Sequence, residues 1–221
     1  MRPSIPLLVV VMSCVASAAL AEDKLDIDAL RAEGYSVSVI SPIFSQLVKF
    51  SLPKGFTTVF EDSNGKQYTR EAVLNGETVE RWSQMVTVTG AKGLSATPKL
   101  TPQSFLERIA SGFESACPDS FSAKSLGATK ISGRDAFMAL AGCGTVSSGG
   151  DSHSEAALLI AIKGAADYYT IQWAERGPAS PKPMAFSDAT WTERLDRLSP
   201  IKLCPVLPRE APLYPSCINQ K

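Results

Sequence analysis

Residues 156–162 read AALLIAI, an unbroken apolar run that decides the fold class. This composition is typical of a strand buried on both faces, whereas a strand with one face in water alternates apolar and polar residues. Ala and Leu also favour helices, but seven residues ending before Gly164 are few for a stable helix. We therefore predict a strand in the interior of a sheet.

The sequence on both sides of this run predicts further strands joined by short turns. Residues 167–173 follow after a turn and place Tyr169, Ile171 and Trp173 on one face. The expected strands upstream are 48–52, 56–60, 67–74, 85–89, 121–131 and 136–141. The Asn-Gly pair at 64–65 is typical of a tight hairpin turn between two of them. Strands connected in this way form an antiparallel meander.

The first expected strand, 48–52, has an alternating pattern. Val48, Phe50 and Leu52 are apolar, and the two residues between them are polar. A strand of this kind buries one face and exposes the other. We therefore expect it to be covered on one side only.

Two segments predict amphipathic helices. Thr101 and Pro102 supply an N-cap and a first-turn proline. The apolar residues that follow at helical spacing are Phe105, Ile109, Gly112, Phe113 and Ala116. A second helix is expected to begin at Thr190, because Glu193 completes a capping box. Its inward-facing residues are Trp191, Leu195 and Leu198. The order of elements predicts an α+β domain, an antiparallel sheet meander with two amphipathic helices packed on it.

The segment LPKGF at 52–56 is followed by two antiparallel strands, a helix that starts at Thr-Pro, a long hairpin and a C-terminal helix. This order of elements resembles the PsbP-like fold superfamily. The stretch GETVERWSQMVTV at 76–88 resembles uncharacterised exported bacterial proteins. The resemblance covers residues 44–200. It implies a PsbP-like fold and a binding or accessory role rather than catalysis.

The N-terminus predicts export. Residues 1–21 combine Arg2, an apolar run at 5–12 and a small-residue site ending at Ala21, which are the parts of a secretory signal peptide. The exported chain is expected to begin at Glu22. A lipid attached to Cys14 is the alternative.

The rest of the chain divides into three expected parts. They are an N-terminal extension at 22–43, a single α+β domain at 44–200 and a proline-rich C-terminal tail at 201–221. No later stretch approaches 18 apolar residues, so no transmembrane span is expected after signal cleavage. We predict a periplasmic or secreted protein.

Four cysteines remain after residue 21: Cys117, Cys143, Cys204 and Cys217. An even number in an oxidising compartment favours two disulfides. The sequential pairing closes the shortest loops, and a bridge between the last two would close the proline-rich tail. Close cysteine pairs and a second His are missing, which disfavours a metal site.

Composition excludes several functional classes. The 22 Lys and Arg residues balance the 22 Asp and Glu residues, and this balance indicates neither nucleic acid nor anionic lipid as a partner. No glycine-rich phosphate loop is present, so no cofactor is expected. The sequence leaves the oligomeric state open.

The most enzyme-like segment is DSHSE at 151–155, which contains Ser152 and the one His of the chain, His153. Catalytic triads converge from distant parts of a fold, and neighbours in an extended segment point to opposite sides. We therefore interpret this segment as a polar loop. A small exported hydrolase with a site near Ser152 and His153 is the alternative.

Two groups of residues are candidate binding sites. Glu80 and Arg81 beside Trp82, together with Glu77, could clamp a planar or cationic group. A turn after Asn75-Gly76, with Trp82 capping the sheet edge and the charges solvated, is the preferred explanation. The second group, Tyr168, Gln172 and Arg176, shares the strand face opposite Trp173 and could form an exposed aromatic patch for a protein partner. Cover by one of the helices is the other explanation.

These observations favour a secreted or periplasmic non-enzymatic binding or accessory domain that recognises another envelope component. Its partner is expected to be an envelope or secreted protein. An inhibitor of a secreted enzyme is a further alternative. Whether the chain is an enzyme stays open, with a binding role preferred.

Overall fold

The computed structural model describes residues 36–148 and 151–219. The predicted signal peptide, its lipidation alternative at Cys14 and the expected start at Glu22 lie outside these residues. Most of the predicted extension at 22–43 lies outside them as well.

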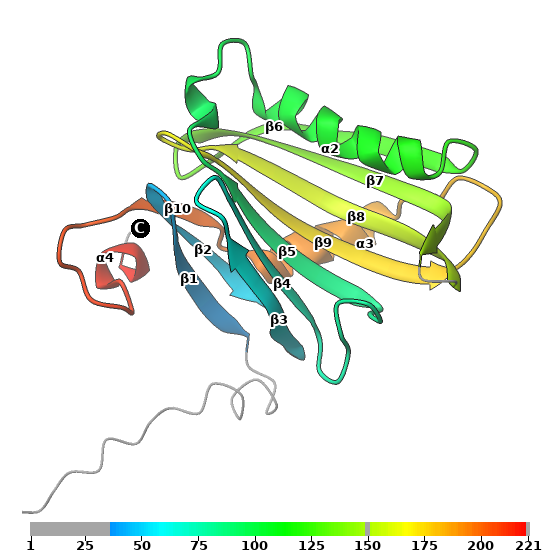
Figure 1. The fold of residues 1–221 in the computed structure, drawn as a ribbon, viewed down its shortest axis with the longest axis horizontal. Helices are drawn as coiled ribbons and strands as arrows, with labels where there is room; N and C mark the ends of the chain where they lie inside the picture. Colours follow the sequence, from blue (N-terminus) through cyan, green and yellow to red (C-terminus); the bar gives the residue numbers. More distant parts are fainter. Residues whose placement is uncertain (1–35, 149–150, 220–221) are drawn as a thin grey trace, which may run out of the picture.

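The described chain forms two antiparallel sheets (Figure 1). The larger sheet has seven strands in the order β3-β4-β5-β9-β8-β7-β6. These are β3 (Phe56–Ser63), β4 (Gln67–Leu74), β5 (Gln84–Ala91), β6 (Phe121–Ile131), β7 (Arg134–Ser148), β8 (Asp151–Lys163) and β9 (Tyr168–Pro178). The smaller sheet has the order β1-β2-β10, with β1 (Val37–Ile43), β2 (Gln46–Leu52) and β10 (Lys202–Pro205).

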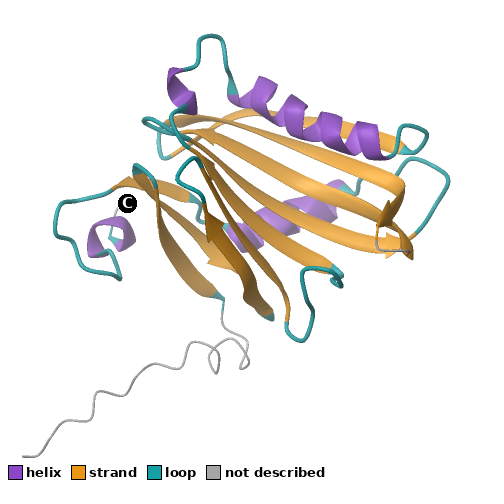
Figure 2. Cartoon of the chain, viewed as in Figure 1, coloured by secondary structure: helices purple, strands orange, loops and turns teal. Residues whose placement is uncertain are grey.

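Helices cover both faces of the larger sheet (Figure 2). Helix α2 (Pro102–Ala116) packs on β6, β7 and β8, whereas α3 (Asp188–Leu198) contacts β8 from the other side and also β2. The main hydrophobic core lies between the larger sheet, α3 and the smaller sheet. Two short elements complete the chain, the 3-10 helix η1 (Leu94–Ala96) and α4 (Pro215–Ile218). The predicted α+β class with an antiparallel sheet is confirmed.

Strand β8 confirms the interpretation of residues 156–162 as an interior strand. It pairs with β7 on one side and β9 on the other. One set of its side chains, Ala156, Leu158, Ile160 and Ile162, enters the main core. The alternate set, Ala157, Leu159 and Ala161, packs under α2. The run is apolar without interruption because both of its faces are covered.

Strand β2 does not have the exposed face that its alternating pattern predicts. Phe50 enters the main core, and Leu47 on the opposite face packs with the C-terminal residues Cys204 and Cys217. Lys49 is also buried. The prediction was wrong because the tail returns to cover the second face.

The two ends of the described chain are part of the fold. β1 pairs with β2 from Val37 onward, and β10 pairs with the other edge of β2. The expected extension and tail therefore each contribute a strand. Without them, both edges of β2 would leave backbone hydrogen-bonding groups unpaired.

Helix α2 begins as predicted, with the Thr101 side chain accepting a hydrogen bond from the Ser104 N–H. Its most buried apolar side chain is Leu106, which the predicted face omitted. Helix α3 begins earlier than predicted, because the Ser187 side chain, and not Thr190, is the N-cap. Thr190 instead donates its backbone N–H to Ser187 Oγ.

Both predicted disulfides are present. Cys117, after α2, joins Cys143 in β7, with 5.7 Å between their Cα atoms. Cys204 in β10 joins Cys217 in α4, at 5.5 Å. The second bridge closes the tail against the smaller sheet. Within the described ranges, no helix is long and apolar enough to cross a membrane.

A buried carboxylate connects the two sheets through hydrogen bonds. Asp167, just before β9, accepts hydrogen bonds from Ser45 N at 3.0 Å and Ser45 Oγ at 2.5 Å in the β1–β2 turn. It also accepts one from Gly93 N at 2.7 Å and one from Tyr169 Oη at 3.2 Å. Burial by itself raises the pKa of Asp167, but these hydrogen bonds outweigh it and hold that pKa below its ordinary value.

Candidate functional site

The structure brings residues from both candidate groups into one cavity. Its volume is about 690 Å³, and it lies where the β4–β5 loop meets the ends of β8 and β9. The lining residues are Glu77, Glu80, Arg81, Trp82, Ser83, Asp151, His153, Arg176 and Gly177. We refer to it as the Trp82 cavity.

Strand register places the loop beside β9. Gln84 at the start of β5 pairs with Glu175 of β9. The ladder continues one step further, because Arg176 donates its backbone N–H to Ser83 O at 2.8 Å. Trp82 is therefore carried to the neighbourhood of Arg176, a residue far from it in the chain.

Arg176 is held between an aromatic ring and a carboxylate. Its guanidinium carbon lies 3.7 Å from the centroid of the Trp82 ring. Its Nε donates to Glu155 Oε2 at 3.2 Å, since Glu155 and Arg176 are direct cross-strand partners. The predicted clamp for an external cation is therefore filled on this face of Trp82 by a cation of the protein itself.

The loop itself is closed by its two glutamates. Glu77 accepts hydrogen bonds from Ser83 Oγ at 2.6 Å and Ser83 N at 3.0 Å. Glu80 accepts one from Thr78 Oγ1 at 2.9 Å. Thr78 also binds both backbone groups of Arg81, at 3.2 and 3.0 Å. These hydrogen bonds within the loop hold the backbone that carries Arg81 and Trp82.

Residues 151–155 are not the loop that was predicted, because β8 already begins at Asp151. His153 and Glu155 lie on the cavity side, with side chains 14% and 19% exposed and 3.6 Å between Nε2 and Oε2. Ser154 is buried toward the other face, beside Phe186 and Trp191. Strand alternation places Ser152 on that face as well, opposite to His153.

The second candidate group is divided by the fold. Tyr168 is fully buried under α2, where its ring centroid lies 5.0 Å from that of Phe105. Its hydroxyl donates to Leu100 O at 2.7 Å. Gln172 is half-buried and does not line the Trp82 cavity. The exposed aromatic patch was wrong for Tyr168, and cover by a helix is the explanation that holds.

Glu155 is bonded to Arg176 and Asp151 lines the same cavity, and no sequence pattern indicated either residue as a neighbour of Arg176. Counting outward along the hairpin formed by β8 and β9 would have placed Glu155 opposite Arg176. The sequence did not predict this end of the hairpin, because residues 151–155 were interpreted as a loop.

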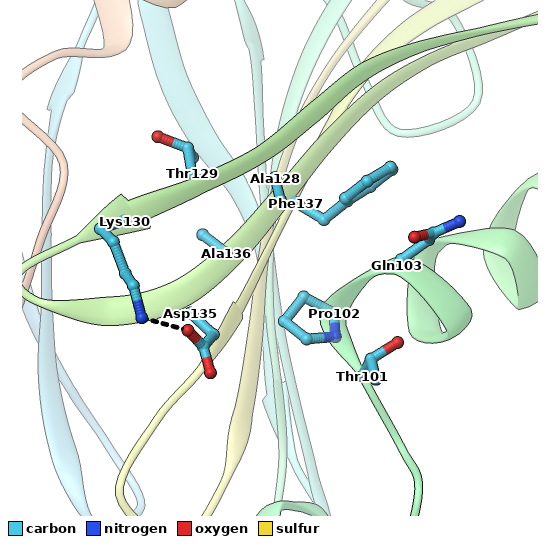
Figure 3. Close-up of a pocket in the computed structure, with 9 residues that line it drawn as sticks. All are labelled: Thr101, Pro102, Gln103, Ala128, Thr129, Lys130, Asp135, Ala136 and Phe137. Atoms are coloured by element: carbon cyan, nitrogen blue, oxygen red, sulfur yellow. Dashed lines mark hydrogen bonds and ion pairs between the residues drawn. The ribbon is translucent and has the colours of Figure 1, made fainter.

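A second cavity of about 450 Å³ lies between the start of α2 and the β6–β7 hairpin (Figure 3). Much of its wall is apolar, with Pro102, Ala136 and Phe137. Its charged residues, Lys130 and Asp135, form an ion pair with each other. The hydrogen bond from Lys130 holds the pKa of Asp135 below its ordinary value. The two charges of this cavity therefore neutralise each other.

Nothing in the described part of the chain forms a cluster of three or more His, Cys, Asp or Glu side chains that could hold a metal ion.

No family model and no curated protein sequence matches this chain. The solved structures that are similar to it, all at low identity, include the following three. A mutant of Protein Mog1 is 11% identical, with a TM-score of 0.41 over 72% of this chain and 84% of that one. The Ran-binding protein Mog1p of Saccharomyces cerevisiae is 10% identical, with a TM-score of 0.39 over 75% and 86%.

The third structure, cyanobacterial PsbP (CyanoP) from Synechocystis sp., is 13% identical, with a TM-score of 0.40 over 75% of this chain and 95% of that one. It carries the name of the superfamily that the sequence resembles. The residues of the Trp82 cavity, and not these likenesses, indicate a function.

Proposed function

We infer that this chain is a secreted or periplasmic binding domain, without enzymatic activity of its own, that recognises another envelope component through the Trp82 cavity. The observation that carries this proposal is the position of Arg176, stacked on Trp82 at 3.7 Å and bonded to Glu155. Aromatic and arginine side chains at an accessible site are typical of protein recognition surfaces.

The arrangement supports binding rather than catalysis. Ser152 and His153 point to opposite faces of β8, so the most enzyme-like segment offers no nucleophile with its base. The remaining polar groups of the cavity are arginines, carboxylates and a serine bonded to Glu77. Such groups hold and orient a partner.

Two disulfides support location in an oxidising compartment. They agree with the export signal predicted at 1–21, which also supports an envelope or secreted partner. Glu80 and Arg81 in the wall of the cavity are exposed, so a large partner can reach them.

The test is site-specific photo-crosslinking in the native host. A photoreactive amino acid replaces Glu80 at the rim of the cavity, and a matched variant carries it at Arg108, exposed on α2. We expect a discrete adduct from position 80 that is absent from position 108 and is lost when Trp82→Leu is added. Equal adducts at the two positions, or an adduct indifferent to Trp82→Leu, would contradict the proposed function.

A further inference from the structure

A pocket of about 300 Å³ lies between β8, β9 and the start of α3, on the sheet face that α3 covers (Figure 2). Its floor comes from two cross-strand pairs, Ser154 with Gly177 and Ala156 with Glu175. A Cβ built on Gly177 would lie 3.1 Å from Ser154 Oγ. The small residues of the floor therefore leave room above the sheet.

The walls of this pocket are largely apolar and aromatic. Met184 and Phe186 come from the segment between β9 and α3, and Trp191 comes from α3 itself. Ser122 Oγ donates to Met184 O at 3.0 Å. The Phe186 ring lies against the sheet, because a Cβ built on Gly142 would be 3.2 Å from it. The walls are thus in place before a ligand arrives, as is typical of small-molecule sites.

The polar group at the floor of the pocket is the hydroxyl of Ser154. This residue is only 4% exposed, and no hydrogen bond joins its Oγ to any residue that the structure describes. A hydroxyl can donate one hydrogen bond and accept others, and burying it without a partner costs free energy. An oxygen of a bound ligand can supply the missing hydrogen bond.

The charged residues around the pocket favour a neutral ligand. Glu175 Oε1 is bonded to Arg194 of α3, and the guanidinium of Arg176 is stacked on Trp82 on the other face of the sheet. The Glu175 carboxylate repels an anion, and its pairing with Arg194 weakens its attraction for a cation. The apolar walls add the cost of removing any charged group from water.

We propose that this pocket binds a small, uncharged molecule with one aromatic ring and a hydroxyl group. The ring packs against Met184, Phe186 and Trp191, and the hydroxyl forms a hydrogen bond with Ser154 Oγ. The volume of about 300 Å³ suffices for a substituted ring, since an apolar cavity of about 150 Å³ holds benzene. This site is separate from the Trp82 cavity and goes beyond the proposed function.

The test uses the full chain with both disulfides formed. The indole N–H signal of Trp191 and the methyl signal of Met184 are followed by NMR during titration. The probe is 4-methylphenol, and the matched compound is toluene, which lacks the hydroxyl. We expect saturable shifts of both signals with 4-methylphenol and about fivefold weaker binding of toluene, because toluene leaves the Ser154 hydroxyl unpaired. Shifts that do not saturate, or toluene binding as tight as that of 4-methylphenol, would overturn the proposal.

A conservative variant locates the hydrogen bond. Ser154→Ala removes the hydroxyl, and we expect about fivefold weaker binding of 4-methylphenol with toluene binding unchanged or tighter. Ser115→Ala, at an exposed position on α2 and on the other face of the sheet, is the matched control and should leave both compounds unaffected. Unchanged binding of 4-methylphenol in Ser154→Ala, or an equal loss for both compounds, would refute the role of the hydroxyl.

Charged analogues test the neutral character of the ligand. The anion 4-methylbenzoate and the cation 4-methylbenzylammonium should each bind at least tenfold more weakly than 4-methylphenol. Equal binding of either one would contradict the choice of an uncharged ligand. Trp82→Leu should leave 4-methylphenol binding unchanged, and a loss there would overturn the assignment to this pocket. The crosslinking at position 80 is therefore read separately, because it depends on the Trp82 cavity alone.

Discussion

Arg176 and Trp82 form a stacked pair in which the guanidinium carbon lies 3.7 Å from the centroid of the indole ring. The pair connects the β4–β5 loop to the end of β9, two segments that only the sheet register brings together. Trp82 also packs at the edge of the apolar layer under α2. It therefore joins the candidate site to the stable part of the fold.

Trp82→Leu should lower the free energy of unfolding by about 2 kcal/mol, because it removes a cation–π contact and part of the packed apolar surface. Trp82→Phe keeps an aromatic face and should cost about half as much. Urea unfolding of the three proteins measures both effects. A loss equal in the two variants would show that stacking with Arg176 contributes nothing to stability.

Asp167→Asn should destabilise the protein by about 2 to 3 kcal/mol, since an amide cannot reproduce all of the hydrogen bonds that the buried carboxylate accepts. The affected donors belong to Ser45, Gly93 and Tyr169. Asp62→Asn, at an exposed position in β3, is the matched control and should stay within about 0.5 kcal/mol of the native protein. Comparable losses in both variants would refute the role of Asp167 as a fastening between the sheets.

Stability should also depend on pH through Asp167. The pKa of this carboxyl is held below its ordinary value of 3.8 in the folded chain. The stabilisation is therefore fully present above about pH 4 and is lost as pH falls through the folded pKa. In unfolding measurements from pH 6 downward, the stability difference between the native protein and Asp167→Asn should shrink below about pH 4. A constant difference throughout the acid range would contradict this assignment.

Gly144→Ala should displace the loop that precedes α3. A Cβ atom at this position would collide with the backbone oxygens of Ser180 and Lys182. The Ser180 N–H donates to Gly144 O at 2.8 Å, and the Thr145 hydroxyl donates to Ser180 O at 2.8 Å. We expect a loss of about 2 to 3 kcal/mol and faster proteolysis between 179 and 187.

Gly112→Ala is the control for that substitution. Gly112 is an exposed helical residue with open space around a built Cβ. Alanine there should stabilise the protein by up to about 1 kcal/mol, because it favours the helix. The two Gly→Ala changes should therefore have opposite signs in the same denaturation assay. A Gly144→Ala protein as stable as the native one would show that the loop is free to move away.

Replacing both Cys204 and Cys217 by Ser should lower the free energy of unfolding by about 3 kcal/mol, according to the loop-entropy account of disulfides. It should also raise amide exchange in β10, because the bridge holds the strand and α4 together around Leu47. Exchange in β7 and β8 should not change at low denaturant. Uniform faster exchange over the whole chain would instead indicate that the tail is required for global stability.

The local elements follow from the amino-acid sequence. The apolar run at 156–162 predicts an interior strand, and the turn chemistry at Asn64-Gly65 predicts a hairpin, which the β3–β4 pair confirms. The Thr101 cap and the spacing of apolar residues predict α2. Cysteine count and spacing predict both disulfides. These features depend on interactions within one element or on simple loop closure, so a single sequence carries them.

Packing between distant parts of the chain sets which strand faces are covered and which distant residues meet. The second face of β2 is buried because the tail returns over Leu47, and Tyr168 is buried because α2 lies on it. Arg176 meets Trp82 only through the pairing of β5 with β9. Each of these contacts depends on strand order and on packing between layers, which are set by the whole core and not by the periodicity of one segment.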